Sequence, residues 1–189
     1  FHMPLQSASD RILGAMHRWY RAEHYARRVE LIHERLPHAA IGADVITGFP
    51  GETEADHVAT TRFIAERPFT YLHVFSYSQR PGTKAATLPG QVSGSVIKRR
   101  ARELRALAET KSAEFRNSQI GRTLRVLTLR RDPLDDPCRT PGISENYLAI
   151  QLPFALTSNE LFTARVTHVE GKILCALPLE PVLAVPETS

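Results

Sequence analysis

A stretch ending in Gly-Phe-Pro-Gly-Glu-Thr has the residue types and spacing of a ligand-binding turn. Residues 41–47, just before it, are rich in β-branched side chains, as is typical of a strand buried on both faces. Gly48 and Gly51 end this strand and allow close backbone approach. Thr53 can cap a following helix, with Asp56 three residues later in a variant of the capping box. We expect either ligand binding beside free helix N–H groups or an ordinary strand-to-helix connection.

The elements that must position this turn alternate between helical and strand patterns. We expect the tail of a strand over residues 1–5, helices over about 10–17 and 23–36, strands over 41–47 and 69–77, and a helix from Thr53 to about Glu66. Short connections in this order imply parallel strands with right-handed crossovers. Three strands cannot close a barrel, and a typical (β/α)₈ barrel takes about 250 residues. The α/β part is therefore expected to be the C-terminal half of a TIM-type barrel.

The pattern changes after a long helix expected from about Ser95 to Arg116. Apolar residues line one side of that helix, and KRRARELR places positive charge on the other, which favours a solvated face over a dedicated RNA-binding helix. Strands are expected at 123–129, 147–152, 161–170 and 173–179, with a proline-rich loop before the second. Four or five short antiparallel strands indicate a small closed all-β barrel, broadly of the OB type. The last residues, 181–189, are expected to form a loose tail.

Composition sets the broad class. The 189 residues are 42% hydrophobic and 23% charged, enough for one or two domains. A net charge of +4 and a pI near 9.3 mildly favour a polyanionic partner. No apolar run approaches the ~20 residues of a membrane helix. The two cysteines, Cys138 and Cys175, form no CxxC-type pair, which argues against a metal site within this chain.

Four strings occur in order and at fitting separations: PLQSASDRIL, MHRWY, ADVITGFPGETEADH and YLHVFSYSQRPGTKAA. Together they resemble the radical S-adenosylmethionine methylthiotransferases, the family of MiaB, MtaB and RimO. In that family a radical SAM barrel is followed by a small β-barrel called TRAM. The resemblance is strong over residues 1–111 and weaker over 117–179. It implies a barrel part at 1–92, a connecting helix at 93–116, a TRAM-like RNA-binding barrel at 117–180 and a tail at 181–189.

HVFSYSQRPGTKAA looks most like the MtaB branch, which implies 2-methylthiolation of N6-threonylcarbamoyladenosine at tRNA position 37. A MiaB-type enzyme acting on N6-isopentenyladenosine in tRNA is the close alternative, and a non-catalytic RNA-binding protein is another. By resemblance, the whole enzyme uses S-adenosylmethionine and two [4Fe-4S] clusters. It takes electrons from a donor, binds the tRNA anticodon stem-loop, and is a cytoplasmic monomer with no membrane contact.

The departures from the family pattern concern the chemistry. The cluster-binding CxxxCxxC motif, three further cysteines and a GGE-type stretch are absent from these residues. We expect them upstream of Phe1, so the chain is interpreted as a C-terminal fragment that is inactive alone. The catalytic residues are expected upstream too.

Site residues follow from the same resemblance. One wall of the cofactor site is expected to be formed by Gln6, Ser7, Ser9, Arg18, Asp44, Ile46, Gly48 and Phe49. Helix capping by the two serines, a surface position for Arg18 and a structural hydrogen bond for Asp44 are the competing interpretations.

Substrate contacts are expected from aromatic and basic residues. They are Tyr77, Arg80, Arg122, Arg125 and Arg165. The competing interpretation is that alternate arginines simply form the solvent-exposed face of half-buried strands. His2 and His73 are expected to be packed barrel residues rather than ligands.

Overall fold

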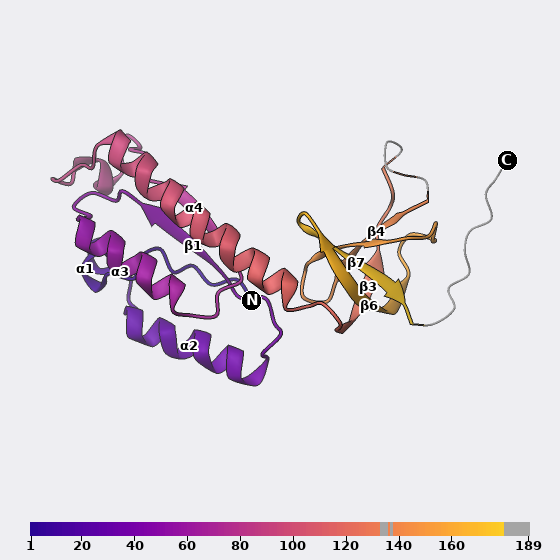
Figure 1. Cartoon of the computed structure of the whole chain (residues 1–189). Coiled ribbons are helices and arrows are strands. Elements are labelled where there is room, and N and C mark those ends of the chain that lie inside the picture. The colour runs from indigo at the N-terminus through magenta and orange to yellow at the C-terminus, as the bar shows by residue number, and fades with distance from the viewer. Residues whose placement is uncertain (133–135, 137, 180–189) are drawn as a thin grey trace. The chain divides into compact units, whose positions relative to one another are not determined.

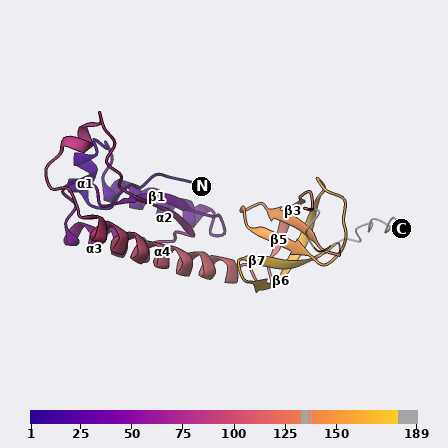
Figure 2. The ribbon, with the colours of Figure 1, turned by 90° about the horizontal axis from the view of Figure 1, so that it is seen from above.

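The computed structural model describes residues 1–132, 136 and 138–179, and it divides into two compact units (Figures 1 and 2). The first unit is Phe1–Ser112 and the second begins at Ala113, so the division falls inside helix α4 (Gly94–Asn117). The boundaries expected at 92 and 116 stay predictions, and the expected tail lies outside the described residues. None of the described helices is both long and apolar enough to cross a membrane.

The first unit is built on a parallel pair of strands, β1 (Gly42–Thr47) and β2 (Tyr71–Ser76). The expected strand tail at the N-terminus runs alongside β1 in parallel, but it forms only two isolated bridges, from His2 to Gly42 and from Gln6 to Val45. This confirms a parallel sheet with helices. The radical SAM half-barrel stays a prediction.

Three helices of this unit lie close to their predicted positions. They are α1 (Asp10–Ala15), α2 (Ala22–Arg35) and α3 (Glu54–Ala65). The 3₁₀ turn η1 (Lys84–Thr87) was not predicted. Helices α2, α3 and α4 bury one apolar cluster against the sheet, which includes Leu5, Val29, Val45, Ile64 and Leu104. Burial of these side chains supplies the main driving force for folding of the unit.

The second unit is a closed barrel of five strands in the order β3-β4-β5-β7-β6, which confirms the predicted small closed barrel. The strands are β3 (Thr123–Thr128), β4 (Thr140–Ser144), β5 (Ala149–Leu152), β6 (Leu161–Glu170) and β7 (Ile173–Pro178). Four pairings are antiparallel, but β5 and β7 pair in parallel, so the expectation of antiparallel strands throughout is wrong for that pair.

Strand β4 lies where the sequence predicted a loop. Its Pro141 lacks an N–H group, but the carbonyl of Pro141 accepts a bond from Leu129 N at 2.8 Å. At Gly142 an added Cβ would lie 2.9 Å from the side chain of Val126 on β3. Strand β4 therefore needs glycine at this position. Because proline and glycine are uncommon inside strands, the sequence pattern predicted a loop here.

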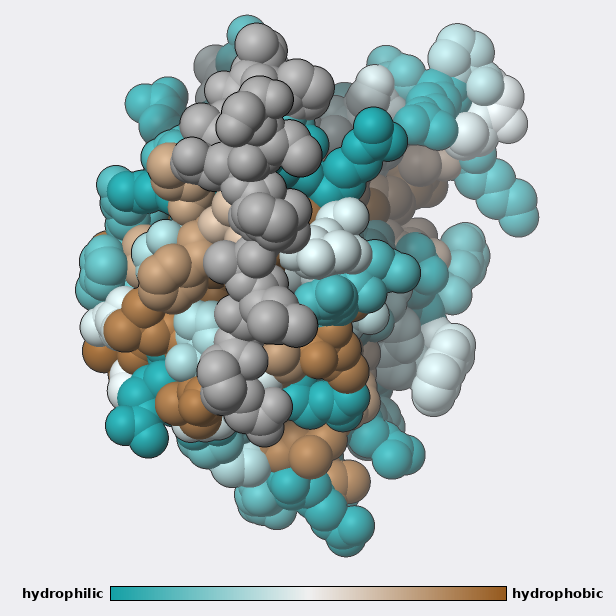
Figure 3. All heavy atoms as spheres, turned by 90° about the vertical axis from the view of Figure 1, so that its right-hand side faces the viewer, coloured by the Kyte–Doolittle hydropathy of each residue, from teal (hydrophilic) through white to brown (hydrophobic). Residues whose placement is uncertain are grey.

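The barrel is filled by its own apolar cluster, which includes Leu124, Val126, Ile150, Leu152 and Leu174. Each lies at an inward position of an alternating strand. On the face of the molecule drawn in Figure 3, hydrophilic and hydrophobic residues are intermixed.

Candidate functional site

The carboxyl ends of the parallel segments open into a pocket of about 410 Å³. This volume is within the range of small-molecule sites. The pocket combines apolar, aromatic and polar side chains from residues 6, 44–49 and 75–85. Its lining is Gln6, Asp44, Ile46, Phe49, Phe75, Ser76, Tyr77, Ser78, Arg80, Thr83 and Ala85. Six residues predicted to bind cofactor or substrate therefore lie around one cavity.

Gln6 occupies a backbone conformation that few non-glycine residues adopt. Its φ is 65°, which is sparsely populated and costs about 1–3 kcal/mol. Two bonds to β1 hold it there, because Gln6 N donates to Asp44 O at 2.8 Å and Ile46 N donates to Gln6 O at 2.9 Å. The residue is buried and borders the pocket.

The aromatic wall of the pocket is formed by Phe49 and Tyr77. Their rings meet edge to face with centroids 5.7 Å apart, a favourable aromatic geometry. The backbone N–H of Tyr77 donates to Thr47 O at 2.8 Å, which anchors the residue after β2. Its hydroxyl is buried without a hydrogen-bond partner among the described residues. An unsatisfied buried hydroxyl is costly, so a polar group of a ligand would stabilise it.

Arg80 lies on the loop after β2 and is exposed at the pocket rim. The loop closes locally, because the Thr83 hydroxyl donates to Arg80 O at 2.8 Å. No ion pair of the Arg80 guanidinium occurs within the described part of the chain. Its five N–H donors are therefore available for a carboxylate or phosphate.

In the Gly-Phe-Pro-Gly-Glu-Thr turn, the N–H groups of Gly48 and Thr53 already donate to carboxylates of the chain, while ligand binding at this turn stays a prediction. Gly48 is buried, and its N–H donates to the Glu52 carboxylate at 2.8 Å. At the start of α3, Thr53 N donates to Asp56 and Asp56 N donates back to the Thr53 hydroxyl, which confirms the capping box. Gly48 is absent from the pocket lining, and its expected contact with the cofactor stays a prediction.

A buried ion pair fixes this turn, and sequence reasoning missed it. Arg100 on α4 contacts the Glu52 carboxylate at 2.7 Å, and each side chain is under 5% exposed. Arg100 also donates to Glu52 O at 3.1 Å and to Glu54 at 3.0 Å. Hydrogen bonds from Arg99, then from Arg100, lower the pKa of Glu54 to about 2. The basic face of α4 thus partly holds the turn, rather than being wholly solvated.

Ser7 and Ser9 lie outside the pocket, and Ser9 is the N-cap of α1. The Ser9 hydroxyl caps α1 through Ile12 N and donates to Asp56 at 2.6 Å. Ser7 is buried, with its hydroxyl 3.3 Å from that of Thr60. Burial alone would raise the pKa of Asp56, but hydrogen bonds from Ser9, Thr53 and Arg11 lower it well below its usual range.

Of two further residues predicted to bind the cofactor, Asp44 borders the pocket and Arg18 does not. Arg18 is exposed and absent from the pocket lining, as its surface interpretation predicts. Asp44 borders the pocket, and its Oδ1 atom lies 3.0 Å from His2 Nε2 and 3.2 Å from His73 Nδ1. Both histidines are exposed, so the prediction that they are packed residues is wrong for this structure.

The predicted RNA-binding arginines lie on the barrel. Arg125 on β3 pairs in register with Thr163, and Arg165 on β6 pairs with Thr123, so the two exposed arginines are diagonal neighbours on one outer face. Arg122 is partly buried, and its Nε atom has no hydrogen-bond partner among the described residues.

Comparison with known proteins identifies relatives over two thirds or more of the chain. No family model matches it. A "tRNA-2-methylthio-N(6)-dimethylallyladenosine synthase" of Thermobifida fusca is 51% identical over 181 residues, which cover 93% of this chain and 37% of that protein. The chain is homologous to these synthases. Proteins of the same name from Mycobacterium sp. (strain MCS) and Streptomyces viridosporus are 49% and 47% identical over 67% of the chain.

These relatives support the resemblance to the methylthiotransferases but not the predicted substrate specificity. The names refer to dimethylallyladenosine, so the MtaB-type specificity expected from HVFSYSQRPGTKAA is not supported and the MiaB-type alternative fits better. The chain spans 37% of the Thermobifida synthase and about a quarter of the other two.

Proposed function

We propose that this chain is part of a tRNA methylthiotransferase that adds a 2-methylthio group to N6-dimethylallyladenosine, the isopentenyl nucleoside, at tRNA position 37. The observation that carries the proposal is 51% identity across 93% of the chain to a synthase named for that product. The match extends over more than the first unit, which ends at Ser112.

The pocket at the ends of β1 and β2 is the proposed site for S-adenosylmethionine. Ile46, Phe49 and Phe75 offer apolar contact to an adenine ring, while Gln6 and Arg80 offer polar groups to a ribose and a carboxylate. The Tyr77 hydroxyl, which has no hydrogen-bond partner among the described residues, and the 410 Å³ volume fit such a ligand. When bound, S-adenosylmethionine supplies the radical and the methyl group of this reaction class.

The donor set of this chain does not fit an iron–sulphur cluster. Clusters are held by several cysteine thiolates, and Cys138 and Cys175 are the two cysteines of the sequence, 37 positions apart. We therefore place the cluster ligands of the proposed enzyme outside these 189 residues and assign this chain to binding and orientation.

S-adenosylmethionine binding to the chain tests the pocket. Tyr77→Phe and Arg80→Ala should each weaken binding by about tenfold, since a hydrogen bond to a charged group contributes about 1.5–3 kcal/mol. Arg18→Ala, which removes an exposed arginine outside the pocket, should leave the affinity unchanged. Equal losses in all three variants, or no binding by the unmodified chain, would contradict the assignment.

Nucleoside mass spectrometry tests the reaction. Deleting the gene should abolish 2-methylthio-N6-isopentenyladenosine in tRNA and leave 2-methylthio-N6-threonylcarbamoyladenosine unchanged. Loss of the second nucleoside instead would favour the MtaB-type reaction. Loss of neither would favour a non-catalytic RNA-binding role.

The exposed arginines of the barrel are the proposed tRNA contacts, a role that the positive charge of Arg125 and Arg165 supports. Replacing both by alanine should weaken binding of an anticodon stem-loop and reduce the salt slope by about one per lost phosphate contact. Arg62→Ala is a matched control, because Arg62 is already paired with Glu66 at 2.6 Å. An unchanged slope in the double variant would refute this surface.

A further inference from the structure

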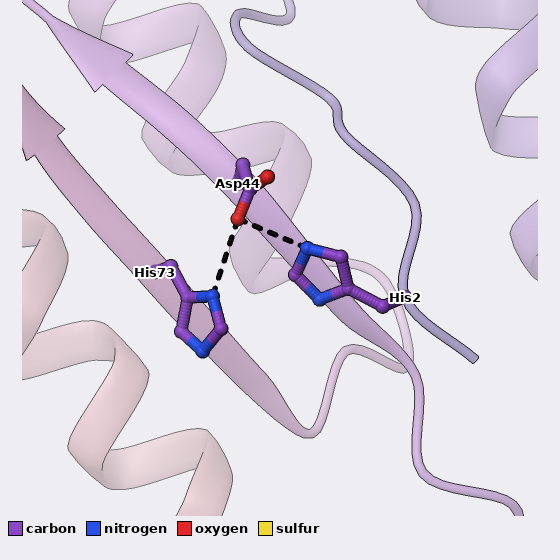
Figure 4. Close-up of side chains that lie close together, drawn as sticks. All are labelled: His2, Asp44 and His73. Atoms are coloured by element: carbon purple, nitrogen blue, oxygen red, sulfur yellow. Dashed lines mark hydrogen bonds and ion pairs between the residues drawn. The ribbon is translucent and has the colours of Figure 1, made fainter.

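Three side chains from three separate segments converge on one point of the sheet (Figure 4). Asp44 projects from β1, His73 from the neighbouring β2, and His2 from the segment paired with β1 on its other side. One carboxylate oxygen, Asp44 Oδ1, lies 3.0 Å from His2 Nε2 and 3.2 Å from His73 Nδ1. We infer that His2, Asp44 and His73 bind one divalent transition-metal ion.

The spacing of the three donor atoms suits a single ion. Zinc–nitrogen and zinc–oxygen bonds are about 2.0–2.2 Å long, so adjacent ligands lie about 3.0 Å apart in octahedral and about 3.4 Å apart in tetrahedral geometry. The two measured separations fall in this interval, and all three donor atoms lie within 4.8 Å of one another. The three donor atoms therefore lie close enough together to share one ion.

The contact between His2 and Tyr71 is compatible with metal binding through Nε2. His2 Nδ1 lies 3.2 Å from the Tyr71 hydroxyl, which in turn donates to Phe1 O at 3.4 Å. When the proton of His2 lies on Nδ1, that N–H can donate to the Tyr71 oxygen, and the lone pair on Nε2 is left to bind the ion. Tyr71 orients His2 as outer partners orient metal-binding histidines.

The donor set selects the class of ion. Two imidazoles and one carboxylate suit zinc and ferrous iron, whereas magnesium and calcium prefer oxygen ligands alone. The His73 side chain is 57% exposed and Asp44 borders the 410 Å³ pocket. The remaining coordination positions would therefore be open to water or a pocket ligand, as in catalytic rather than structural sites.

A second cluster in the barrel, His168, Glu170 and Cys175, has similar donor types but suits a cation less well. Its Glu170 is already 3.4 Å from the Arg139 guanidinium, a positive charge that opposes a bound metal. Burial, then the neighbouring Glu170 carboxylate, raises the pKa of the Cys175 thiol, which disfavours the ligating thiolate. This cluster serves as the internal comparison for the test.

Cobalt(II) titration of the metal-free chain tests the inference, because Co²⁺ in such a site gives visible ligand-field absorption. We expect one Co²⁺ per chain, displaced by Zn²⁺. His73→Ala and Asp44→Ala should each weaken binding more than about 100-fold, and Tyr71→Phe by about tenfold, the effect typical of an outer partner. His73→Ala is the safest variant for folding because its side chain is exposed.

Two controls separate this site from other metal binding. His33→Ala removes an exposed histidine of α2 and Cys175→Ala removes a donor of the barrel cluster; both should bind Co²⁺ as the unmodified chain does. Absence of stoichiometric binding, unchanged affinity in His73→Ala, or loss of binding in Cys175→Ala would overturn the inference. The measurement needs neither tRNA nor S-adenosylmethionine, so it is independent of the proposed function.

Discussion

At the scale of single residues, Gly48 shows why the turn after β1 requires glycine. Its φ is +79°, and an added Cβ would lie 2.3 Å from the Ile97 side chain of α4. The glycine is therefore required twice, once by backbone conformation and once by the helix packed on the turn.

Gly48→Ala should be strongly destabilising for these two reasons. The left-handed conformation contributes about 1–2 kcal/mol and overpacking against Ile97 a further 1–3 kcal/mol, roughly. Urea unfolding measures the loss. Gly82→Ala is a matched control, since Gly82 has φ +82° but nothing within 4 Å of the added Cβ. Equal losses in the two variants would show that Ile97 does not restrict this position.

At the scale of elements, α3 is held at its amino end by Asp56. This carboxylate accepts bonds from Thr53 and Ser9 and pairs with Arg11, which connects α3 to the start of α1. A negative charge in the first helical turn is also favoured by the helix dipole.

Asp56 should make stability depend on acidic pH. Because its pKa is lowered in the folded chain, its contribution is complete above the unfolded-state pKa of about 3.9 and is lost as pH falls below that value toward the folded pKa. Urea unfolding from pH 7 to pH 3 should show a smaller acid-induced loss in Asp56→Asn. Glu34→Gln, which removes an exposed carboxylate of α2, should retain the loss of the unmodified chain.

The buried pair of Glu52 and Arg100 connects the turn to α4. Glu52→Gln should lower the free energy of unfolding by about 3 kcal/mol, the lower end for a broken buried pair, because Glu54 remains beside Arg100. Adding Arg100→Met should recover part of that loss. Glu66→Gln breaks an exposed pair with Arg62 and should change stability by less than about 1 kcal/mol. Similar losses from the buried and exposed pairs would contradict this.

At the scale of the whole molecule, the two units have separate apolar cores. The second unit closes its own sheet, so every strand has two paired neighbours within it. A closed barrel has no free strand edge to satisfy elsewhere. These features predict that the unit folds without the first.

A chain of residues 113–189 should therefore unfold cooperatively in denaturant. Within it, Leu152→Ala removes a fully buried side chain and should lower the free energy of unfolding by about 2–5 kcal/mol. Circular dichroism during denaturation measures both. Leu161→Ala, at a position 56% exposed, should have a small effect. A gradual transition in the unmodified segment would contradict independent folding.

Local patterns in the sequence predicted most of the elements. Helical spacing placed α2 and α3, Thr53 and Asp56 formed the predicted capping box, and β6 spans the predicted residues 161–170. The strings that indicated the family are also local. Such signals depend on neighbours within a few positions, so a single sequence carries them.

Tertiary structure alone decided which residues share a site. Gln6, Phe49 and Tyr77 meet because parallel strands bring their carboxyl ends to one edge, while Ser9 caps α1 and Ser7 contacts Thr60. Sequence periodicity does not indicate the contact between Glu52 and Arg100, which lie 48 positions apart. Nor does it indicate that His2, Asp44 and His73 come together. Contacts of this kind depend on how elements pack, which the spacing within each element does not contain.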